Sequence, residues 1–208
     1  MDIRLQPHNM HWRYPDRFRE LDPHLSRLQE LSLVYRFPLL DELPRTEPGI
    51  YAVTGGRQIG KTTLLKQYMA DLLASGHDPA GIVYLPGEVF DDHHALVAGV
   101  TDCLGGLEER PNPIFLLLDE VTYIAGWDRG VKYLADAGLL RNVILLLTGS
   151  DCVLIREARM RFPGRRGRAD QPDFHLFPLT FAEVVALRRG VSHAAVQELT
   201  RAPSTAEL

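Results

Sequence analysis

Eight consecutive residues constrain this chain more than any other part of it. Residues 55–62 read GGRQIGKT and fit the pattern G-x-x-x-x-G-K-[ST] at every specified position. The glycines at its two ends, Gly55 and Gly60, permit a tight backbone in which successive N–H groups point inward at a phosphate. Lys61 supplies a mobile positive charge for the β- and γ-phosphates, and the Thr62 hydroxyl is a suitable ligand for Mg²⁺.

Two interpretations of this loop differ in what they require of its neighbours. A glycine-rich turn between a strand and a helix need not bind anything. Here the loop follows an apolar run that predicts a strand, and it opens a segment that predicts a helix, whose N-terminal end favours an anion. We therefore expect these residues to bind nucleotide phosphates: Gly55, Gly56, Arg57, Gln58, Ile59, Gly60, Lys61, Thr62 and Thr63.

The chain beyond the loop alternates short apolar runs with longer periodic segments. The apolar runs predict strands at 49–54, 81–85, 114–119, 143–148 and 173–179. Helical periodicity and caps predict helices at 61–75, 92–104, 127–137 and 151–160, and at 181–190 after a capping box. Alternating strands and helices indicate a three-layer α/β/α fold of the P-loop NTPase type, with a mostly parallel five-stranded sheet.

Residues 1–48 form a prefix that is rich in arginine, proline and aromatic residues. Asp22 and Pro23 are typical of a helix N-cap and first turn, so we expect a short helix at 23–31 that packs on the core. We expect a P-loop ATPase core at 49–190 and a C-terminal helix or tail at 191–208.

Composition excludes several other classes of protein. The chain has 208 residues, of which 45% are hydrophobic and 24% charged, as in ordinary globular proteins. No run approaches the roughly 20 apolar residues of a membrane span. The polar N-terminus lacks a secretory signal and two cysteines are too few for a disulfide framework, so we expect a cytoplasmic protein. The net charge of −4 argues against coating of nucleic acid.

Two carboxylates end the apolar run at 114–119. Because ligands bind at the carboxyl ends of parallel strands, we expect Asp119 to hold Mg²⁺ through water. We expect Glu120 to orient or deprotonate an attacking water, which favours hydrolysis over phosphoryl transfer to a small molecule. The alternative is a solvated acidic strand exit, which is common in α/β proteins.

Thr148 ends the next apolar run, in the sequence VILLLTGS. Similarity to related ATPases, which place a polar side chain here to contact the γ-phosphate or the attacking water, makes Thr148 our candidate sensor. The alternative is that Thr148, Gly149 and Ser150 only form a turn that caps the following helix.

Six arginines crowd residues 156–168. Arg165 and Arg168, which follow glycines, are the preferred candidates for stabilising γ-phosphate charge within the subunit or across to a neighbouring one. A grip on a nucleic-acid backbone and a solvated basic loop are the alternatives.

Together these motifs resemble bacterial and archaeal predicted ATPases with an AAA-type P-loop core, usually followed by a C-terminal domain of unknown function. The resemblance rests on Trp12-Arg13, DPHLSRL, GGRQIGKTTLLKQ, FLLLDEVTYIAGWDRGVKYLADAGLL, LLLTGSD, PGRRGR and FPLTFAEV. It implies ATP and Mg²⁺ as ligands, and a sheet with an extra strand between the phosphate-loop and acidic strands. It also implies a C-terminal domain beyond this sequence, so we expect a truncated form or a separate partner that supplies it.

Three hypotheses of function follow. The leading one is an ATP-binding, Mg²⁺-dependent ATPase that uses hydrolysis to drive a conformational or assembly change, as a homo-oligomer or with a separate effector partner. The second is a nucleotide-dependent switch or binding module with little intrinsic hydrolysis. The third is a nucleic-acid-associated ATPase that uses the arginine segment, which the net charge does not favour.

Overall fold

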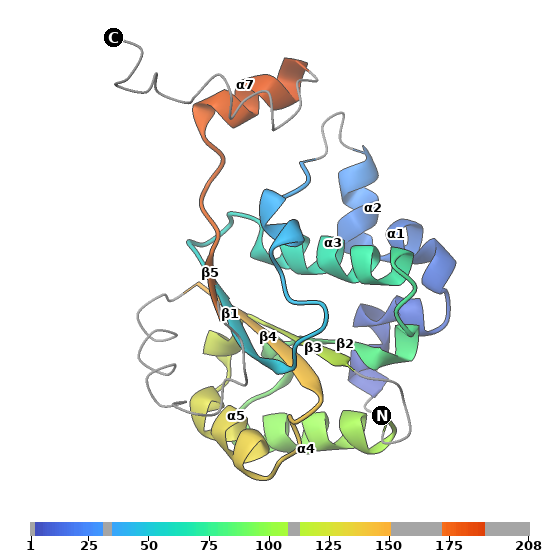
Figure 1. Cartoon of the computed structure of the whole chain (residues 1–208), viewed down its shortest axis with the longest axis vertical. Coiled ribbons are helices and arrows are strands. Elements are labelled where there is room, and N and C mark those ends of the chain that lie inside the picture. The colour runs from blue at the N-terminus through green and yellow to red at the C-terminus, as the bar shows by residue number, and fades with distance from the viewer. Residues whose placement is uncertain (1–2, 31–34, 108–112, 151–171, 190–208) are drawn as a thin grey trace.

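A five-stranded parallel sheet forms the centre of the computed structural model, which describes residues 3–30, 35–107, 113–150 and 172–189 (Figure 1). Its strands are β1 (Gly49–Thr54), β2 (Ile82–Pro86), β3 (Ile114–Asp119), β4 (Val143–Gly149) and β5 (Asp173–His175). The strand order is β2-β3-β4-β1-β5. β4 therefore lies between the phosphate-loop strand β1 and the acidic strand β3, which confirms the predicted α/β fold and its extra strand.

Helices cover both faces of the sheet (Figure 1). α3 (Lys61–Ala74) packs on one face, and α4 (His93–Gly105) and α5 (Trp127–Asp136) pack on the other. α7 (Phe181–Arg189) follows β5, and its Thr180–Glu183 capping box forms as predicted. The predicted helix at 151–160 lies outside the described residues.

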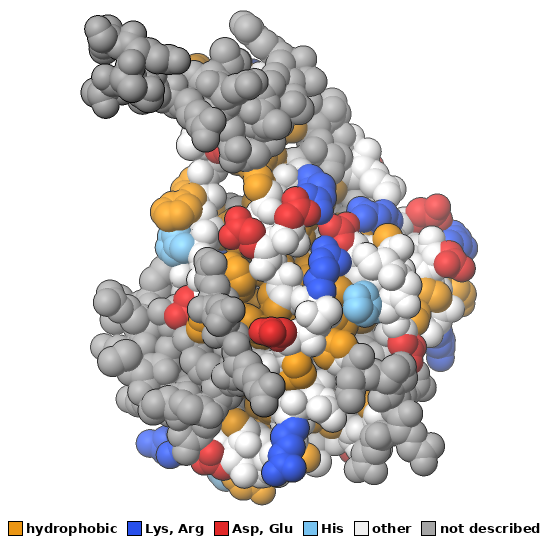
Figure 2. All heavy atoms as spheres, in the orientation of Figure 1, with side chains coloured by type: hydrophobic (Ala, Val, Ile, Leu, Met, Phe, Trp, Pro, Cys, Tyr) orange, Lys and Arg blue, Asp and Glu red, His pale blue; other side chains and the backbone are white. Residues whose placement is uncertain are grey.

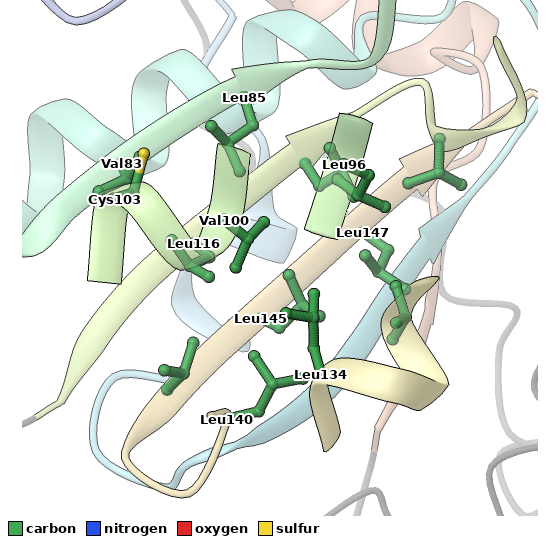
Figure 3. Packing of buried hydrophobic residues seen from close by; sticks show 14 of the residues in the cluster. Val83, Leu85, Leu96, Val100, Cys103, Leu116, Leu134, Leu140, Leu145 and Leu147 are labelled. Atoms are coloured by element: carbon green, nitrogen blue, oxygen red, sulfur yellow. The ribbon is translucent and has the colours of Figure 1, made fainter. Parts of the chain in front are cut away.

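Successive side chains of a strand point to opposite sides of the sheet. Both faces are apolar because the residues of both parities are hydrophobic. On the α4–α5 face, the strands contribute leucines and valines that interdigitate with the two helices (Figure 3). On the α3 face, the alternate residues of the same strands pack against α3 and the prefix; they include Tyr51, Val53, Phe115, Leu117, Ile144 and Leu146.

The predicted strand at 173–179 is too long. β5 ends at His175, and Phe177 and Leu179 are exposed. Pro178 has no N–H for a ladder, and this end of the run has no burial to hold it in the sheet. The apolar composition of residues 173–179 predicts a longer strand than the structure has.

The prefix is built of short helical pieces. These are α1 (Phe18–Leu21), α2 (Pro23–Glu30) and 3₁₀ turns at Ile3–His8, Met10–Trp12, Pro15–Arg17 and Pro38–Asp41. Three further 3₁₀ turns, Pro79–Gly81, Gly87–Val89 and Val121–Tyr123, lie between core elements. Asp22 caps α2 as predicted, since its Oδ1 accepts from the N–H groups of His24 (2.9 Å) and Leu25 (3.0 Å). No helix in the described part of the chain is long and apolar enough to cross a membrane.

The prefix also satisfies the outer edge of β2, the strand at one end of the sheet. Asn9 Nδ2 donates to the carbonyl of Tyr84 (2.8 Å), and Asn9 Oδ1 accepts from the N–H of Tyr84 (2.7 Å). His11 Nε2 and Trp12 Nε1 both contact the carbonyl of Ile82, at 2.8 and 2.9 Å. Side chains thus take the place of a neighbouring strand at these two residues.

Candidate functional site

Three polar side chains from adjacent strands lie on the α3 face of the sheet. Tyr84 is on β2, Asp119 ends β3 and Thr148 is near the end of β4. Each has the parity of the apolar residues that face α3, such as Ile82, Leu117 and Leu146, so strand alternation directs all of them to one side. Their positions near the carboxyl ends of the strands bring them close to Thr62, the last residue of the phosphate loop.

Asp119 is the centre of this polar group. Its Oδ2 accepts hydrogen bonds from the Thr62 hydroxyl and the Tyr84 hydroxyl, each at 2.7 Å, and its Oδ1 accepts one from Thr148 at 2.5 Å. Asp119 is itself buried. The two residues predicted as metal ligands, Thr62 and Asp119, are therefore in direct contact.

Glu120 is held by its backbone and by its carboxylate. Its φ of 51° lies in the left-handed region, which non-glycine residues rarely occupy and which clusters at functional sites. Its N–H donates to Thr148 Oγ1 at 2.9 Å. Its carboxylate accepts from the Ser150 N–H (3.0 Å) and hydroxyl (2.5 Å). Thr148 consequently links both carboxylate residues at the end of β3.

Lys61 joins the loop to the two strand ends. Its Nζ donates to the carbonyls of Gly55 (3.2 Å) and Gly56 (2.7 Å) and to Ser150 Oγ (2.9 Å). It also lies 3.3 Å from Glu120 Oε1. Lys61, which was predicted to bind phosphate, and Glu120, which was predicted to act on the attacking water, are thus an ion pair in this structure.

The glycines of the loop are required by close neighbours. A Cβ on Gly55 would lie 2.6 Å from the carbonyl oxygen of Leu176, and one on Gly60 would lie 2.7 Å from Phe37 Cζ. Gly60 also has a φ of +98°, which disfavours a side chain. The ring of Phe37, in the prefix, therefore packs directly against Gly60 of the phosphate loop.

The remaining predicted loop residues differ in their surroundings. Arg57 and Gln58 are exposed, Ile59 is half-buried and Gln58 has a φ of 60°. Thr63 Oγ1 lies 3.0 Å from Nε2 of His24 on α2. Arg165 and Arg168 lie outside the described residues, so their role stays a prediction.

Three contributors to this site were missed from the sequence: Tyr84, Lys66 and Ser150. Lys66 of α3 lies 3.0 Å from Asp22 Oδ2, and the two side chains are 5% and 2% exposed. A lysine inside an otherwise buried stretch of helix, and a tyrosine in the apolar run GIVYL with the same strand parity as Asp119, were the available signals.

Two pKa shifts describe how the missed residues behave. Burial and the neighbouring Asp119 raise the pKa of Tyr84, so its hydroxyl stays protonated and remains a donor. Burial lowers the pKa of Lys66, and the Asp22 carboxylate opposes that shift. The described residues contain no group of three or more His, Cys, Asp or Glu side chains suited to hold a metal without further ligands.

Comparison with known proteins agrees with this architecture. Residues 47–185 match the sequence profile of the family described as AAA domain. An uncharacterized protein of Haemophilus influenzae is 28% identical over 139 residues, which are 64% of this chain and 32% of that protein. The chain thus spans about a third of the length of this relative.

Solved structures resemble the fold at low sequence identity. The Aeropyrum pernix ORC1 protein in complex with DNA superposes with a TM-score of 0.51 and 13% identity, covering 93% of this chain and 54% of that one. AMPPCP-bound DnaA from Aquifex aeolicus has a TM-score of 0.43 and 18% identity, covering 77% and 52%. The family profile covers well over half of the chain, and the sheet of the chain has the AAA-type strand order. The chain therefore belongs to the AAA domain family of P-loop ATPases.

Proposed function

We propose that the chain binds ATP together with Mg²⁺ and hydrolyses it to drive a conformational or assembly change. The contact that carries the proposal is the 2.7 Å hydrogen bond between Thr62 at the start of α3 and Asp119 at the end of β3. It joins a phosphate loop to an acidic strand end through the two residue types that P-loop ATPases use to hold a metal.

The donor set fits Mg²⁺. A hydroxyl and a carboxylate are hard oxygen donors, and Mg²⁺ is commonly held by one or two carboxylates, substrate phosphates and water. Thr62 and Asp119 would hold the ion on the protein side. When bound, the ion would neutralise charge on the phosphate oxygens.

Each remaining residue has a chemical role in this proposal. Lys61 would give up the carbonyls of Gly55 and Gly56 for phosphate oxygens, while the loop N–H groups and the N-terminus of α3 hold the anion. Glu120 would orient or deprotonate the attacking water. Thr148, which contacts Asp119 and the N–H of Glu120, would transmit the state of the γ-phosphate to both.

We carry the other sequence predictions forward as parts of the same proposal. These are the charge-stabilising role of Arg165 and Arg168, the division into a prefix (1–48), a core (49–190) and a tail (191–208), and a cytoplasmic location. Assembly into a homo-oligomer, or action with a separate C-terminal effector, also stays proposed. AMPPCP binding is a property of the DnaA structure, and a nucleotide ligand of this chain is part of the proposal.

The test is the isosteric variant Glu120→Gln, which removes the base and keeps the size of the side chain. We expect phosphate release to fall at least about 100-fold while ATP binding survives. Glu42→Gln, at an exposed glutamate of the prefix outside the site, is the matched control and should keep the wild-type rate. Loss of ATP binding in Glu120→Gln, or an unchanged rate, would contradict the assigned role.

A nucleotide-dependent switch is the second candidate, and one observation favours it. The carboxylate of Glu120 is bonded to Ser150 and lies 3.3 Å from Lys61, so it is engaged on both oxygens. Activation of water would require these contacts to change. If wild-type phosphate release never exceeds that of Glu120→Gln at any protein concentration while ATP still binds, the switch is the better description.

The nucleic-acid hypothesis gains less support. Basic and acidic side chains of the described residues are interspersed on the face that Figure 2 presents. The arginine segment lies outside the described residues. Binding to nucleic acid at low salt that weakens steeply with added salt would support this hypothesis, and no binding at low salt would retire it.

A further inference from the structure

A buried ammonium group links the prefix to the interior of the α3 face. Lys66 Nζ lies 3.0 Å from Asp22 Oδ2 and donates to the carbonyl of His8 at 3.0 Å, and both partners belong to the prefix. A buried charge of this kind is held in place because any displacement would leave it unpaired in a medium of low dielectric. The position of Lys66 is thus set by residues 8 and 22.

The same ammonium lies over an aromatic ring. Lys66 Nζ is 3.6 Å from the ring centroid of Tyr84, well within the range of a cation–π interaction. Asn9 holds the backbone of Tyr84 from the other direction by bonding its N–H and its carbonyl. The prefix therefore fixes the backbone of Tyr84 directly and its ring through Lys66.

The hydroxyl of this restrained ring bonds Asp119. Tyr84 OH donates to Oδ2 at 2.7 Å, the same oxygen that Thr62 contacts. Thr62 is a proposed ligand of the metal, whereas Tyr84 is not, and it bonds the same carboxylate from a neighbouring strand. Groups that hydrogen-bond a metal-binding carboxylate set its orientation and its affinity for the ion.

We propose that Tyr84 is a positioning residue for the Asp119 carboxylate, and that the prefix sets the Mg²⁺ affinity of the site through the chain Asp22–Lys66–Tyr84–Asp119. This proposal rests on the proposed function, because it assigns a second tier of residues to the same metal site. It makes the prefix part of the ATP site's chemistry in addition to part of its packing.

Tyr84→Phe tests the first link. The measurement is equilibrium binding of a fluorescent ATP analogue titrated with Mg²⁺, with a parallel titration in EDTA. We expect the Mg²⁺ concentration at half-maximal effect to rise about 10-fold, while binding in EDTA stays unchanged. A residue that only supports the fold would lower the melting temperature without moving the Mg²⁺ midpoint of the folded protein.

Tyr68→Phe is the matched control. Tyr68 is also a buried tyrosine on the α3 side of the sheet, and its hydroxyl donates to the carbonyl of Pro44. The Tyr68→Phe substitution removes a buried hydroxyl group that makes no hydrogen bond to Asp119. An equal shift of the Mg²⁺ midpoint in both variants, or no shift in Tyr84→Phe, would overturn the proposal.

The second link is tested by removing both charges of the pair in Asp22→Asn/Lys66→Met, which avoids an uncompensated buried charge. We expect a Mg²⁺ midpoint raised about 3-fold, and no further shift when the same pair of changes is added to Tyr84→Phe, because a relay through Tyr84 is already cut. Equal additional shifts in the two backgrounds would show that the prefix does not act through Tyr84.

The failures of the two proposals give different results. If the wild-type chain binds no ATP analogue, or binds it without any Mg²⁺ dependence, the proposed function or its metal site is wrong and this inference falls with it. If wild-type binding depends on Mg²⁺ and Tyr84→Phe leaves the midpoint unchanged, only the positioning role is wrong.

Discussion

The two faces of the sheet use adjacent residues of the same strands for different purposes. On the α4–α5 face, Leu85, Leu118 and Leu147 form a row of register partners across β2, β3 and β4. On the α3 face, the polar group of the candidate site consists of the residue before Leu85 and the residues after Leu118 and Leu147, namely Tyr84, Asp119 and Thr148. Adjacent residues of one strand thus serve hydrophobic packing on one face and the candidate site on the other.

The difference shows how stability and reactivity are separated across a single layer. The leucine row gives its strands hydrophobic burial up to their ends, so the opposite face can carry buried polar groups at the same level. The side chains of those groups are in turn satisfied by hydrogen bonds to each other, to the Thr62 hydroxyl and to the N–H of Glu120. The two faces should therefore respond differently to mutation.

The largest effect is expected from a cavity on the packing face. Leu116→Ala, in the middle of β3 among residues of the α4–α5 cluster, should lower the free energy of unfolding by about 4 kcal/mol. ATP affinity of the remaining folded protein should stay unchanged. Leu117→Ala, the next residue and on the α3 face, should destabilise similarly and also weaken nucleotide binding. Denaturant unfolding and binding assays on both variants test this, and equal effects of the two on affinity would contradict the functional difference between the two faces.

The next effect concerns the buried ion pair on the α3 face. Asp22→Asn keeps a capping side chain for α2 but leaves Lys66 without its counter-charge, so we expect a loss of about 3 kcal/mol in unfolding free energy. Asp41→Asn breaks the exposed pair with Arg36, whose side chains are both largely solvated, and should change the melting curve little. A small effect of Asp22→Asn would mean that Lys66 does not depend on the prefix.

Acid should lower the free energy of unfolding through His11, the buried prefix residue that contacts the carbonyl of Ile82. Burial lowers the pKa of His11 to about 4, below the value of 6.5 in the unfolded chain. The unfolded chain therefore takes up the proton first, and stability present above pH 6.5 is lost as the pH falls toward 4. Between pH 7 and pH 5 this amounts to about 2 kcal/mol.

The variant His11→Gln, which keeps a donor but does not titrate, isolates this contribution. Its unfolding free energy should fall less between pH 7 and pH 5 than that of the wild type, measured in denaturant at each pH. His77→Gln, at a partly buried imidazole, should have a smaller influence on the slope. Identical slopes for wild type and His11→Gln would exclude His11 as the acid-sensitive group.

Local signals explain why most of the fold could be predicted. Each central strand is a continuous apolar run, each major helix has a recognisable start or end, and the loop at 55–62 is a contiguous pattern. Asp119, Glu120 and Thr148 end apolar runs, so strand alternation and the carboxyl-edge rule were enough to bring them together.

The second tier of the site depends on pairings that no local pattern encodes. Asp22 and Lys66 are 44 positions apart, and Tyr84 and Asp119 are on separate strands, so only the packed fold brings them together. The end of β5 was missed for the opposite reason: an apolar run indicates a strand only where something covers it, and Phe177 is exposed. Sequence identified the loop and its acids, and packing identified what holds them.

The pairing of Asn9 with Tyr84 has a consequence for how molecules of this chain meet in solution. An open strand edge offers N–H and C=O groups to which a strand of another molecule can add, and aggregation often begins there. The amide of Asn9 supplies one donor and one acceptor, as a neighbouring strand would, and so ends the sheet at β2. The prefix thereby blocks extension of the sheet beyond β2. In a chain lacking residues 1–12, the edge of β2 would be open to pairing with a strand of another copy.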